Sequence, residues 1–208
     1  MAGRTKDNSH LFFHDEELFE KHGYVCGADE AGRGPLAGPV FAAAVIFAPG
    51  TRIEGLNDSK KLSEKKREEL FDIIKETALC WHVEPAWVPE IEEKNILNAS
   101  LSAMRRSVDA LSQKPGIVLI DGSVCRGFEG YNAASLVKGD AKSAAVAAAS
   151  VLAKVSRVRY MVELDGICPG YGFAAHKGYP TAAHYEAIKR LGVTKYHRPS
   201  FLKNLHTK

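Results

Sequence analysis

Apolar and polar residues alternate along the chain in blocks whose lengths suit strands and helices in turn. Residues 24–28 (YVCGA) and 40–48 (VFAAAVIFA) are apolar runs joined by the glycine- and proline-rich segment EAGRGPLAG. This pattern predicts a β-hairpin. The run IVLI at 117–120 is wholly apolar, which is typical of a strand covered on both faces, and a further short strand is expected near 134–138.

Segments with helical spacing lie between and after these strands. Ser63 can cap a helix whose apolar residues recur on one face, and the small-residue run AKSAAVAAASVLA begins a long helix that can approach a sheet closely. The expected helices are 63–77, 95–112, 141–164 and 181–191, and residues 78–88 are expected to be a strand ended by Pro85 or Pro89. The alternation of strands and helices predicts an α/β fold.

Composition favours one compact domain over the whole chain, 1–208. Of the 208 residues, 45% are apolar and 25% are charged, as in ordinary globular proteins. The longest uncharged stretch, 34–51, contains three prolines, and LFFHDEELFE near the N-terminus is too acidic for a signal peptide. Four cysteines show no metal-binding spacing. We therefore expect a soluble, cytoplasmic protein with no membrane association.

The net charge of +3 is unevenly divided along the chain. Residues 171–208 carry seven Lys or Arg against one acid, so the rest of the chain sums to −3. The same segment holds six of the chain's Phe, Trp and Tyr residues. Basic residues interleaved with aromatics suit a nucleic-acid backbone, and a solvated basic face over core aromatics is the alternative.

Four acids stand where solvated helix faces do not explain them. Asp29 and Glu30 follow an apolar strand, Asp121 follows IVLI, and Asp140 precedes the small-residue helix. An unpaired ionised carboxylate in such surroundings costs several kcal/mol or shifts its pKa until it is neutral. These four acids therefore need cations.

Two kinds of cation can neutralise these acids. Arg33 or Lys138 can pair with a single acid, and this is the favoured interpretation for any one acid taken alone. Four convergent acids instead suit Mg²⁺ or Mn²⁺, and a pair of such ions can activate water and stabilise the leaving oxygen in phosphodiester cleavage. The spacing of the acids in the sequence does not show whether they converge.

Two other motifs point to different chemistry. Gly32, Gly34 and Ala37 satisfy G-x-G-x-x-A, but a second strand is expected to follow them, whereas a dinucleotide site needs a helix there. His176 and His184 could suggest zinc, but neither a cysteine nor a third histidine has suitable spacing. Surface or phosphate-contacting histidines are the favoured interpretation.

Six blocks of sequence, in order, closely resemble the ribonuclease HII family from residue 24 to about residue 198. They are GADEAGRGPLAGPV, NDSKKLSEKKRE, IDGS, VKGD, AAASVLAKVSR and YGFAAHKGYPT. The resemblance implies an RNase H-like fold, a central mixed sheet flanked by helices with additional C-terminal helices. It also implies an endonuclease that cuts the RNA strand of RNA–DNA hybrids and incises at single ribonucleotides in duplex DNA, leaving 3′-hydroxyl and 5′-phosphate ends.

The resemblance also implies roles for particular residues. The family's four catalytic, metal-binding acids match Asp29, Glu30, Asp121 and Asp140, with Mg²⁺ or Mn²⁺ as cofactor. The family residues that contact substrate match the following positions: the GRG turn at Gly32, Arg33 and Gly34, which meets the ribose 2′-hydroxyl; Lys60, which reaches phosphate; and Tyr179, which packs on the next deoxyribose.

Three further expectations follow from the resemblance. Val158 stands where the family usually carries Asp, which affects local helix packing or an outer contact rather than the four acids. Residues 1–22 are expected to be an N-terminal extension, too short for the extra substrate-binding domain of ribonuclease HIII, and residues 171–208 to contact substrate. Because all four acids are present, an active nuclease is favoured over a silent RNA–DNA binding module, and a monomer is expected.

Overall fold

The computed structural model describes residues 8–202, which form a five-stranded mixed sheet flanked by helices. The strand order is β3-β2-β1-β4-β5, and β2 pairs antiparallel with both β1 and β3 while β4 pairs parallel with both β1 and β5. The strands are β1 (Val25–Ala31), β2 (Val40–Ile46), β3 (Cys80–Ala86), β4 (Ile117–Asp121) and β5 (Ala133–Leu136). The predicted hairpin is confirmed as β1 and β2, and the predicted α/β fold with a mixed sheet is confirmed.

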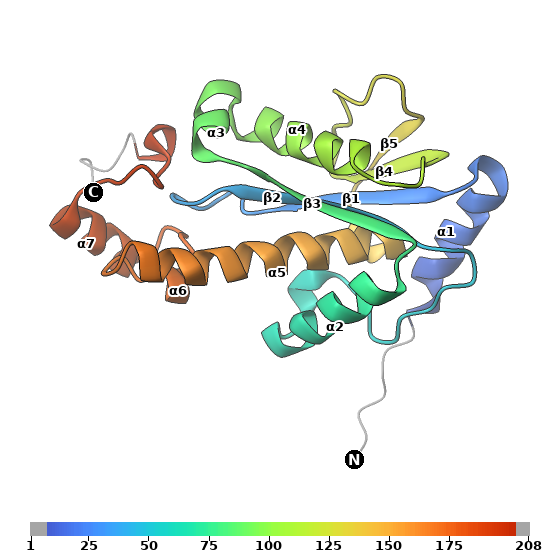
Figure 1. Ribbon diagram of the computed structural model, residues 1–208, viewed down its shortest axis with the longest axis horizontal. Coiled ribbons are helices and arrows are strands. Elements are labelled where there is room, and N and C mark those ends of the chain that lie inside the picture. The colour runs from blue at the N-terminus through green and yellow to red at the C-terminus, as the bar shows by residue number, and fades with distance from the viewer. Residues whose placement is uncertain (1–7, 203–208) are drawn as a thin grey trace, which may run out of the picture.

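Helices cover both faces of this sheet (Figure 1). On one face α4 (Ile96–Asp109) packs against β1, β2 and β3, and α3 (Val88–Lys94) packs on α4. On the other face α5 (Ala144–Ile167) runs across β1 and β2, with α2 (Glu64–Thr77) packed on α5. The remaining elements are α1 (Ser9–His22), α6 (Phe173–His176), α7 (Ala182–Leu191) and the short 3-10 turns η1 (Ser59–Lys61), η2 (Gly139–Ala141) and η3 (Pro199–Phe201).

Small residues let α5 lie directly on the sheet. Its alanines at 144–149 are buried, and β1 presents Gly27 to them. A Cβ built on Gly27 would lie 2.1 Å from the backbone of Ala145, closer than any real contact. The close approach fixes the N-terminal half of α5 against the strand that carries Asp29.

The predicted elements needed several corrections. The strand predicted over 78–88 neither ends at Pro85 nor reaches Pro89: β3 runs through Pro85 to Ala86, and α3 begins at Val88. An edge strand tolerates proline because one row of its N–H groups has no strand partner. The long helix predicted from residue 141 begins at Ala144, because a 3-10 turn precedes it. The short helices α3 and α6 were not predicted.

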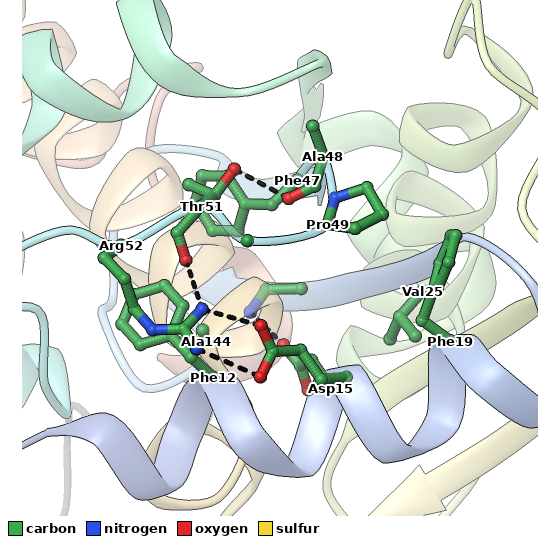
Figure 2. A pocket seen from close by; sticks show the side chains of 13 residues that line it. Phe12, Asp15, Phe19, Val25, Phe47, Ala48, Pro49, Thr51, Arg52 and Ala144 are labelled. Carbon is green, nitrogen blue, oxygen red and sulfur yellow. Dashed lines mark hydrogen bonds and ion pairs between the residues drawn. The ribbon is translucent and has the colours of Figure 1, made fainter.

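Most of the N-terminal extension is the helix α1, which packs over the start of α5. The Asp15 carboxylate accepts a hydrogen bond of 2.9 Å from the Ala145 N–H at that helix N-terminus, and Arg52 pairs with Glu16 at 2.8 Å (Figure 2). The pocket drawn in Figure 2 has a volume of only about 40 Å³, and its position between α1 and the sheet is that of a packing gap. Residues 1–7, and residues 203–208 of the predicted C-terminal segment, lie outside the described residues.

Within residues 8–202, none of the helices combines the length and the apolar character that crossing a membrane requires.

The contact between β1 and α5 gives a test of this packing. We expect Gly27→Ala to lower the free energy of unfolding by about 3 kcal/mol, because the added methyl group meets the α5 backbone, which cannot move without losing the helix N-terminus. Urea denaturation measures the change. Gly166→Ala, near the exposed end of the same helix with open space around it, should leave stability unchanged or raise it by about 0.5 kcal/mol. Equal effects of the two variants would contradict this account.

Candidate active site

Two of the four predicted acids leave neighbouring strands on the same face of the sheet. Asp29 lies in β1 and Asp121 ends β4, and the parallel pairing of these strands sets them side by side. Asp29 is paired with Ala43 of β2, and Ala43 packs against α5. Asp121 lies two residues after Leu119, and Leu119 packs against Val146 of α5. Because alternate residues of a strand share a face, both carboxylates face α5.

The other two acids lie beside this pair, Glu30 in β1 itself and Asp140 in a 3-10 turn. Glu30 follows Asp29 at the end of β1, and its N–H donates to the Asp29 carboxylate at 2.7 Å. Asp140 lies in η2, whose first residue, Gly139, donates its N–H to Asp121 Oδ1 at 2.7 Å. The structure therefore brings all four predicted acids to one end of the sheet.

Mutual repulsion and burial act on these carboxylates. Burial raises the pKa of Asp29 well above its ordinary value, and the nearby charges of Glu30 and Asp121 raise it further. Burial also raises the pKa of Glu30, with Asp121 contributing and the cation of Arg33 opposing. Arg33 pairs with Glu30 at 3.6 Å, as the single-acid interpretation predicted.

Asp140 is neutralised differently. Burial raises its pKa, the cation of Lys60 opposes this, and Asp58 adds to the rise because its side chain is hydrogen-bonded to Asp140. Lys60, and not Lys138, forms an ion pair with Asp140, at 3.4 Å. Burial raises the pKa of Asp58, but hydrogen bonds from the Lys60 N–H and from Asp140 outweigh it, so the pKa is lowered overall. The pKa of Asp140 is therefore raised overall, whereas that of Asp58 is lowered.

A cavity of about 390 Å³ opens beside the acids. It is lined by three of them and by lysines from three separate elements: Asp29, Glu30 and Asp121, with Lys60, Lys154 and Lys177. Burial, together with the neighbouring cations of Arg67 and Lys60, lowers the pKa of Lys154. The cavity thus has an acidic floor and a basic rim.

The long helix contributes residues that the sequence analysis did not single out. Ser150, Lys154 and Arg157 lie one or two turns apart on the face of α5 that lines the cavity. The Ser150 hydroxyl donates to Asp29, which lowers the pKa of that carboxyl, and it also contacts Ser59 at 2.9 Å. Polar residues at helical spacing within an otherwise small, apolar helix were the available signal. Val158 also lines the cavity wall, so the unusual residue faces the cavity and not the core.

The predicted substrate residues surround the same cavity. Gly32 is buried at a φ of 101°, which only glycine adopts without strain, while Arg33 and Gly34 are exposed. A Cβ built on Gly34 would lie 3.7 Å from the ring of Tyr179, and that tyrosine is 46% exposed. Lys60 is exposed on the opposite rim. Three of the predicted substrate residues, Gly32, Lys60 and Tyr179, therefore line one cavity, and Arg33 and Gly34 follow Gly32 on the surface.

The basic, aromatic C-terminal segment was predicted either to bind a nucleic-acid backbone or to be a solvated basic face over core aromatics, and the structure supports each interpretation for some of its residues. Tyr171 and Phe173 are buried and stack with ring centroids 5.3 Å apart, so they are core residues. Arg198 is fully buried and is no phosphate ligand, while Lys177 and Tyr179 line the cavity. Only part of the segment therefore offers a surface to nucleic acid.

The histidines of this segment are structural, which corrects the prediction of a surface or phosphate-contacting role. His184 is fully buried, its Nδ1–H donates to the Tyr179 carbonyl at 3.0 Å, and its Nε2 lies 3.2 Å from Nε2 of His197. His197 accepts at Nδ1 from the Thr194 N–H, so its Nε2–H is the donor to His184. His176 stacks on His184 and accepts from the Gly178 N–H. These neutral rings hold the loop that carries Tyr179.

The negative charge of the four acids is suited to a divalent cation, but their side chains are not arranged around a single metal position. Asp29 and Asp121 lie together without a cation bonded to either within residues 8–202, and their repulsion would be relieved by an oxygen-preferring dication. As the side chains stand, Glu30 turns to Arg33 and Asp140 to Lys60. Accordingly, no group of three His, Cys, Asp or Glu side chains in the described part of the chain is arranged as a ready metal site.

The fold and the acid-floored cavity define a nuclease of the ribonuclease H-like class. The crystal structure of the ribonuclease H2 from Pyrococcus horikoshii OT3 matches with a TM-score of 0.73 and 25% identity, over 88% of this chain and 97% of that one. The RNase H-like fold implied by the sequence resemblance is confirmed.

Comparison of the sequence with known families assigns the chain to a narrower group than the fold does. The ribonuclease HII family model matches residues 26–204. Ribonuclease HII of Clostridioides difficile (strain 630) is 50% identical over 194 residues, 90% of this chain and 76% of that protein. Ribonuclease HII of Laribacter hongkongensis (strain HLHK9) is 56% identical over 178 residues, 85% of this chain and 90% of that protein. The chain belongs to the ribonuclease HII family, and it is a ribonuclease H, a hydrolase that acts on nucleic acid.

The histidine cluster predicts acid sensitivity. Burial and the neighbouring His184 lower the pKa of His197 to about 4, whereas an unfolded histidine titrates near 6.5. Between pH 6.5 and pH 4, His197 is therefore protonated in the unfolded state but not in the folded state. The free energy of unfolding, which is highest above pH 6.5, falls as the pH is lowered towards 4. We expect a loss of about 1–3 kcal/mol, measured by urea denaturation at pH 7 and pH 5.

The control replaces the titrating ring. His197→Gln keeps a donor that reaches His184 but cannot be protonated, so its stability should change less between pH 7 and pH 5. An unchanged pH dependence in this variant would place the acid sensitivity elsewhere.

Proposed function

We propose that the chain is an endoribonuclease that cuts the RNA strand of RNA–DNA hybrids and incises DNA at single embedded ribonucleotides. The observation that carries this is the pair of acids formed by the buried Asp29 and the half-buried Asp121, set side by side by parallel strands at the floor of a cavity with a basic rim. Such a floor attracts divalent cations and such a rim attracts phosphates, and phosphodiester hydrolysis needs both.

Asp29, Glu30, Asp121 and Asp140 would hold two Mg²⁺ or Mn²⁺ ions. Bound there, the ions would supply an ionised water at neutral pH and neutralise charge on the scissile phosphate. The chain's own contribution is placement: β1 and β4 fix two carboxylates rigidly, and the Gly139 N–H keeps Asp121 in position. Glu30 and Asp140 would exchange their present partners, Arg33 and Lys60, for the ions.

That exchange would free two cations for the substrate. Arg33 is 48% exposed and Lys60 is 73% exposed, so both side chains can reach a phosphate once their acids bind metal. Water would attack the phosphorus in line with its bond to the ribose 3′-oxygen. That bond would break, the 3′-oxygen would leave as a 3′-hydroxyl, and the phosphate would stay on the following nucleotide. The products would therefore be a 3′-hydroxyl and a 5′-phosphate.

Recognition of a ribonucleotide would come from the exposed turn and the exposed ring. The backbone of Gly32, Arg33 and Gly34 can approach a sugar closely because two of these residues have no side chain. Polar backbone groups there are satisfied by a 2′-hydroxyl and left unpaired by deoxyribose. The Tyr179 ring next to this turn can pack on the deoxyribose that follows. Together they would suit removal of ribonucleotides misincorporated into DNA.

The whole chain would act as one catalytic domain and as a monomer, with the accessible part of 171–208 contacting the duplex. The four cysteines are unpaired, which is typical of the reducing cytoplasm where such DNA is found. The alternative is a module that binds hybrids without cutting them. An assay on duplex DNA carrying one ribonucleotide, with Mg²⁺ or with EDTA, separates the two, because only the nuclease gives metal-dependent incision.

Removing either central acid should abolish turnover. We expect Asp29→Asn and Asp121→Asn each to lower kcat by about three orders of magnitude, because each removes a charged ligand oxygen at the cavity floor. Affinity for a hybrid, measured by fluorescence anisotropy in Ca²⁺, should change little. Retained turnover in either variant would reject the assignment.

A stability measurement shows that such losses are not unfolding. Because burial raises the folded-state pKa of Asp29, ionising it in the folded protein destabilises the fold as the pH rises. In EDTA, Asp29→Asn should therefore be more stable relative to the parent at pH 8 than at pH 4. A variant that is inactive and also less stable at both pH values would point to damage to the fold.

The tyrosine ring should matter only at a junction. We expect Tyr179→Ala to lower kcat/KM for a single embedded ribonucleotide about tenfold more than for a continuous RNA–DNA hybrid, because only the first substrate presents a deoxyribose to the ring. Tyr179→Phe keeps the ring and should behave like the parent. Equal losses on both substrates would contradict this role.

A further inference from the structure

Two arginines are buried behind the substrate turn without acidic partners. Arg198 is fully buried and Arg157 is 3% exposed. Within residues 8–202, no ion pair links either guanidinium to a carboxylate. Arginine is almost never fully buried unless it is paired, and here two lie close enough for each charge to act on the other. An arrangement this unfavourable needs a compensating set of contacts.

Backbone carbonyls provide the compensation for Arg198. Its three nitrogens donate to the carbonyls of Gly32 at 2.8 Å, Arg33 at 3.0 Å and Gly38 at 2.7 and 2.9 Å. Two of these carbonyls belong to the turn proposed to meet the ribose 2′-hydroxyl. Arg198 therefore holds this turn from behind, on the side away from substrate.

Arg157 lies beneath Gly32 of this turn and connects the residues that follow the turn, Ala37 and Pro39, to the loop that carries Tyr179. Its Nε donates to Pro39 at 3.1 Å, and one terminal nitrogen donates both to Ala37 at 3.2 Å and to Lys177 at 3.0 Å. Its guanidinium lies 5.8 Å from the centre of the Tyr179 ring, which is a cation–π distance. A Cβ built on Gly32 would lie 2.1 Å from the Arg157 Nε, so the side chain also fills the space beneath the turn.

The backbone joins the two substrate segments as well. The Leu36 N–H donates to the Gly178 carbonyl and the Arg198 N–H donates to the Leu36 carbonyl, each at 2.8 Å. The turn and the loop, almost 150 residues apart in sequence, are therefore one continuous unit.

Charge and shape both require arginine at these positions. Burial lowers the pKa of Arg157 to about 10, and burial together with Arg157 lowers the pKa of Arg198 to about 9, so both remain protonated at neutral pH. A planar fork can donate to several carbonyls at fixed angles, whereas the single ammonium of lysine cannot span them.

We propose that Arg157 and Arg198 are positioning residues that fix the distance between the Gly32–Gly34 turn and the Tyr179 ring. Since one segment is proposed to read a 2′-hydroxyl and the other the next deoxyribose, this fixed distance selects a ribonucleotide followed directly by a deoxyribonucleotide. The inference rests on the proposed function, and it adds residues that act through the turn and the ring.

The test compares two substrates. Arg198→Lys and Arg157→Lys keep the charge but lose the fork, so the turn and the ring should shift relative to each other. We expect kcat/KM for duplex DNA with one ribonucleotide to fall about 10- to 100-fold more than kcat/KM for a continuous RNA–DNA hybrid. An equal fall on both substrates would show a purely structural role and overturn the proposal.

Coupling to the tyrosine makes the test sharper. In a Tyr179→Ala background the ring is absent, so adding Arg198→Lys or Arg157→Lys should not change the ratio of the two kcat/KM values further. A further fall in that ratio would mean that the arginines act independently of the ring, which also overturns the proposal. The two lysine variants test the same distance separately, so one that fails to fold leaves the other informative.

Controls separate this inference from the proposed function. Arg105 is an arginine on α4 that likewise donates to two loop carbonyls, those of Gly127 and Glu129, away from the cavity, so Arg105→Lys should keep the parental ratio. If the parent protein itself makes no metal-dependent incision, the proposed function fails. If the parent incises and the lysine variants keep its ratio, only the positioning role fails.

Discussion

Repulsion between carboxylates that the sheet forces together is the constraint on which this molecule depends. Asp29 and Asp121 are brought side by side by the pairing of β1 with β4, and a one-residue slip of either strand would turn its apolar residues away from the core. Burial and proximity raise the pKa of Asp29. The fold thus stores an unfavourable interaction at one end of its sheet, which is how active sites commonly differ from the rest of a protein.

The rest of the structure accommodates that repulsion without removing it. Gly27 lets α5 come close enough to place Ser150 against Asp29, and the Gly139 N–H bonds Asp121. Arg33 and Lys60 pair only with the outer acids, and both are exposed. The carboxylates of Asp29 and Asp121 therefore remain available to a metal cation, and the side chains of Arg33 and Lys60 remain available to a phosphate.

Buried charge of the opposite sign has a different part in the fold. Arg157 and Arg198 are buried as Asp29 and Asp140 are, yet backbone carbonyls accept hydrogen bonds from the two arginines, so these charges hold loops in place. Arg157 lines the same cavity as Asp29, Glu30 and Asp121. In the proposed function, chemistry and recognition belong to separate groups of residues: the strand ends would supply reactive charge, and the loops behind the rim would supply fixed distances.

The sequence by itself predicted the strands, the long helices, the family and the four unusual acids. The spacing of apolar residues and the position of an acid next to an apolar run can both be read from a short stretch of chain. The sequence could not show that Lys60 pairs with Asp140, or that Ser150 and Arg157 face the cavity, because those contacts join segments far apart in sequence. It also left the histidines and Arg198 indistinguishable from surface groups. Only the tertiary structure decided their burial, since burial depends on what the rest of the chain places around a residue.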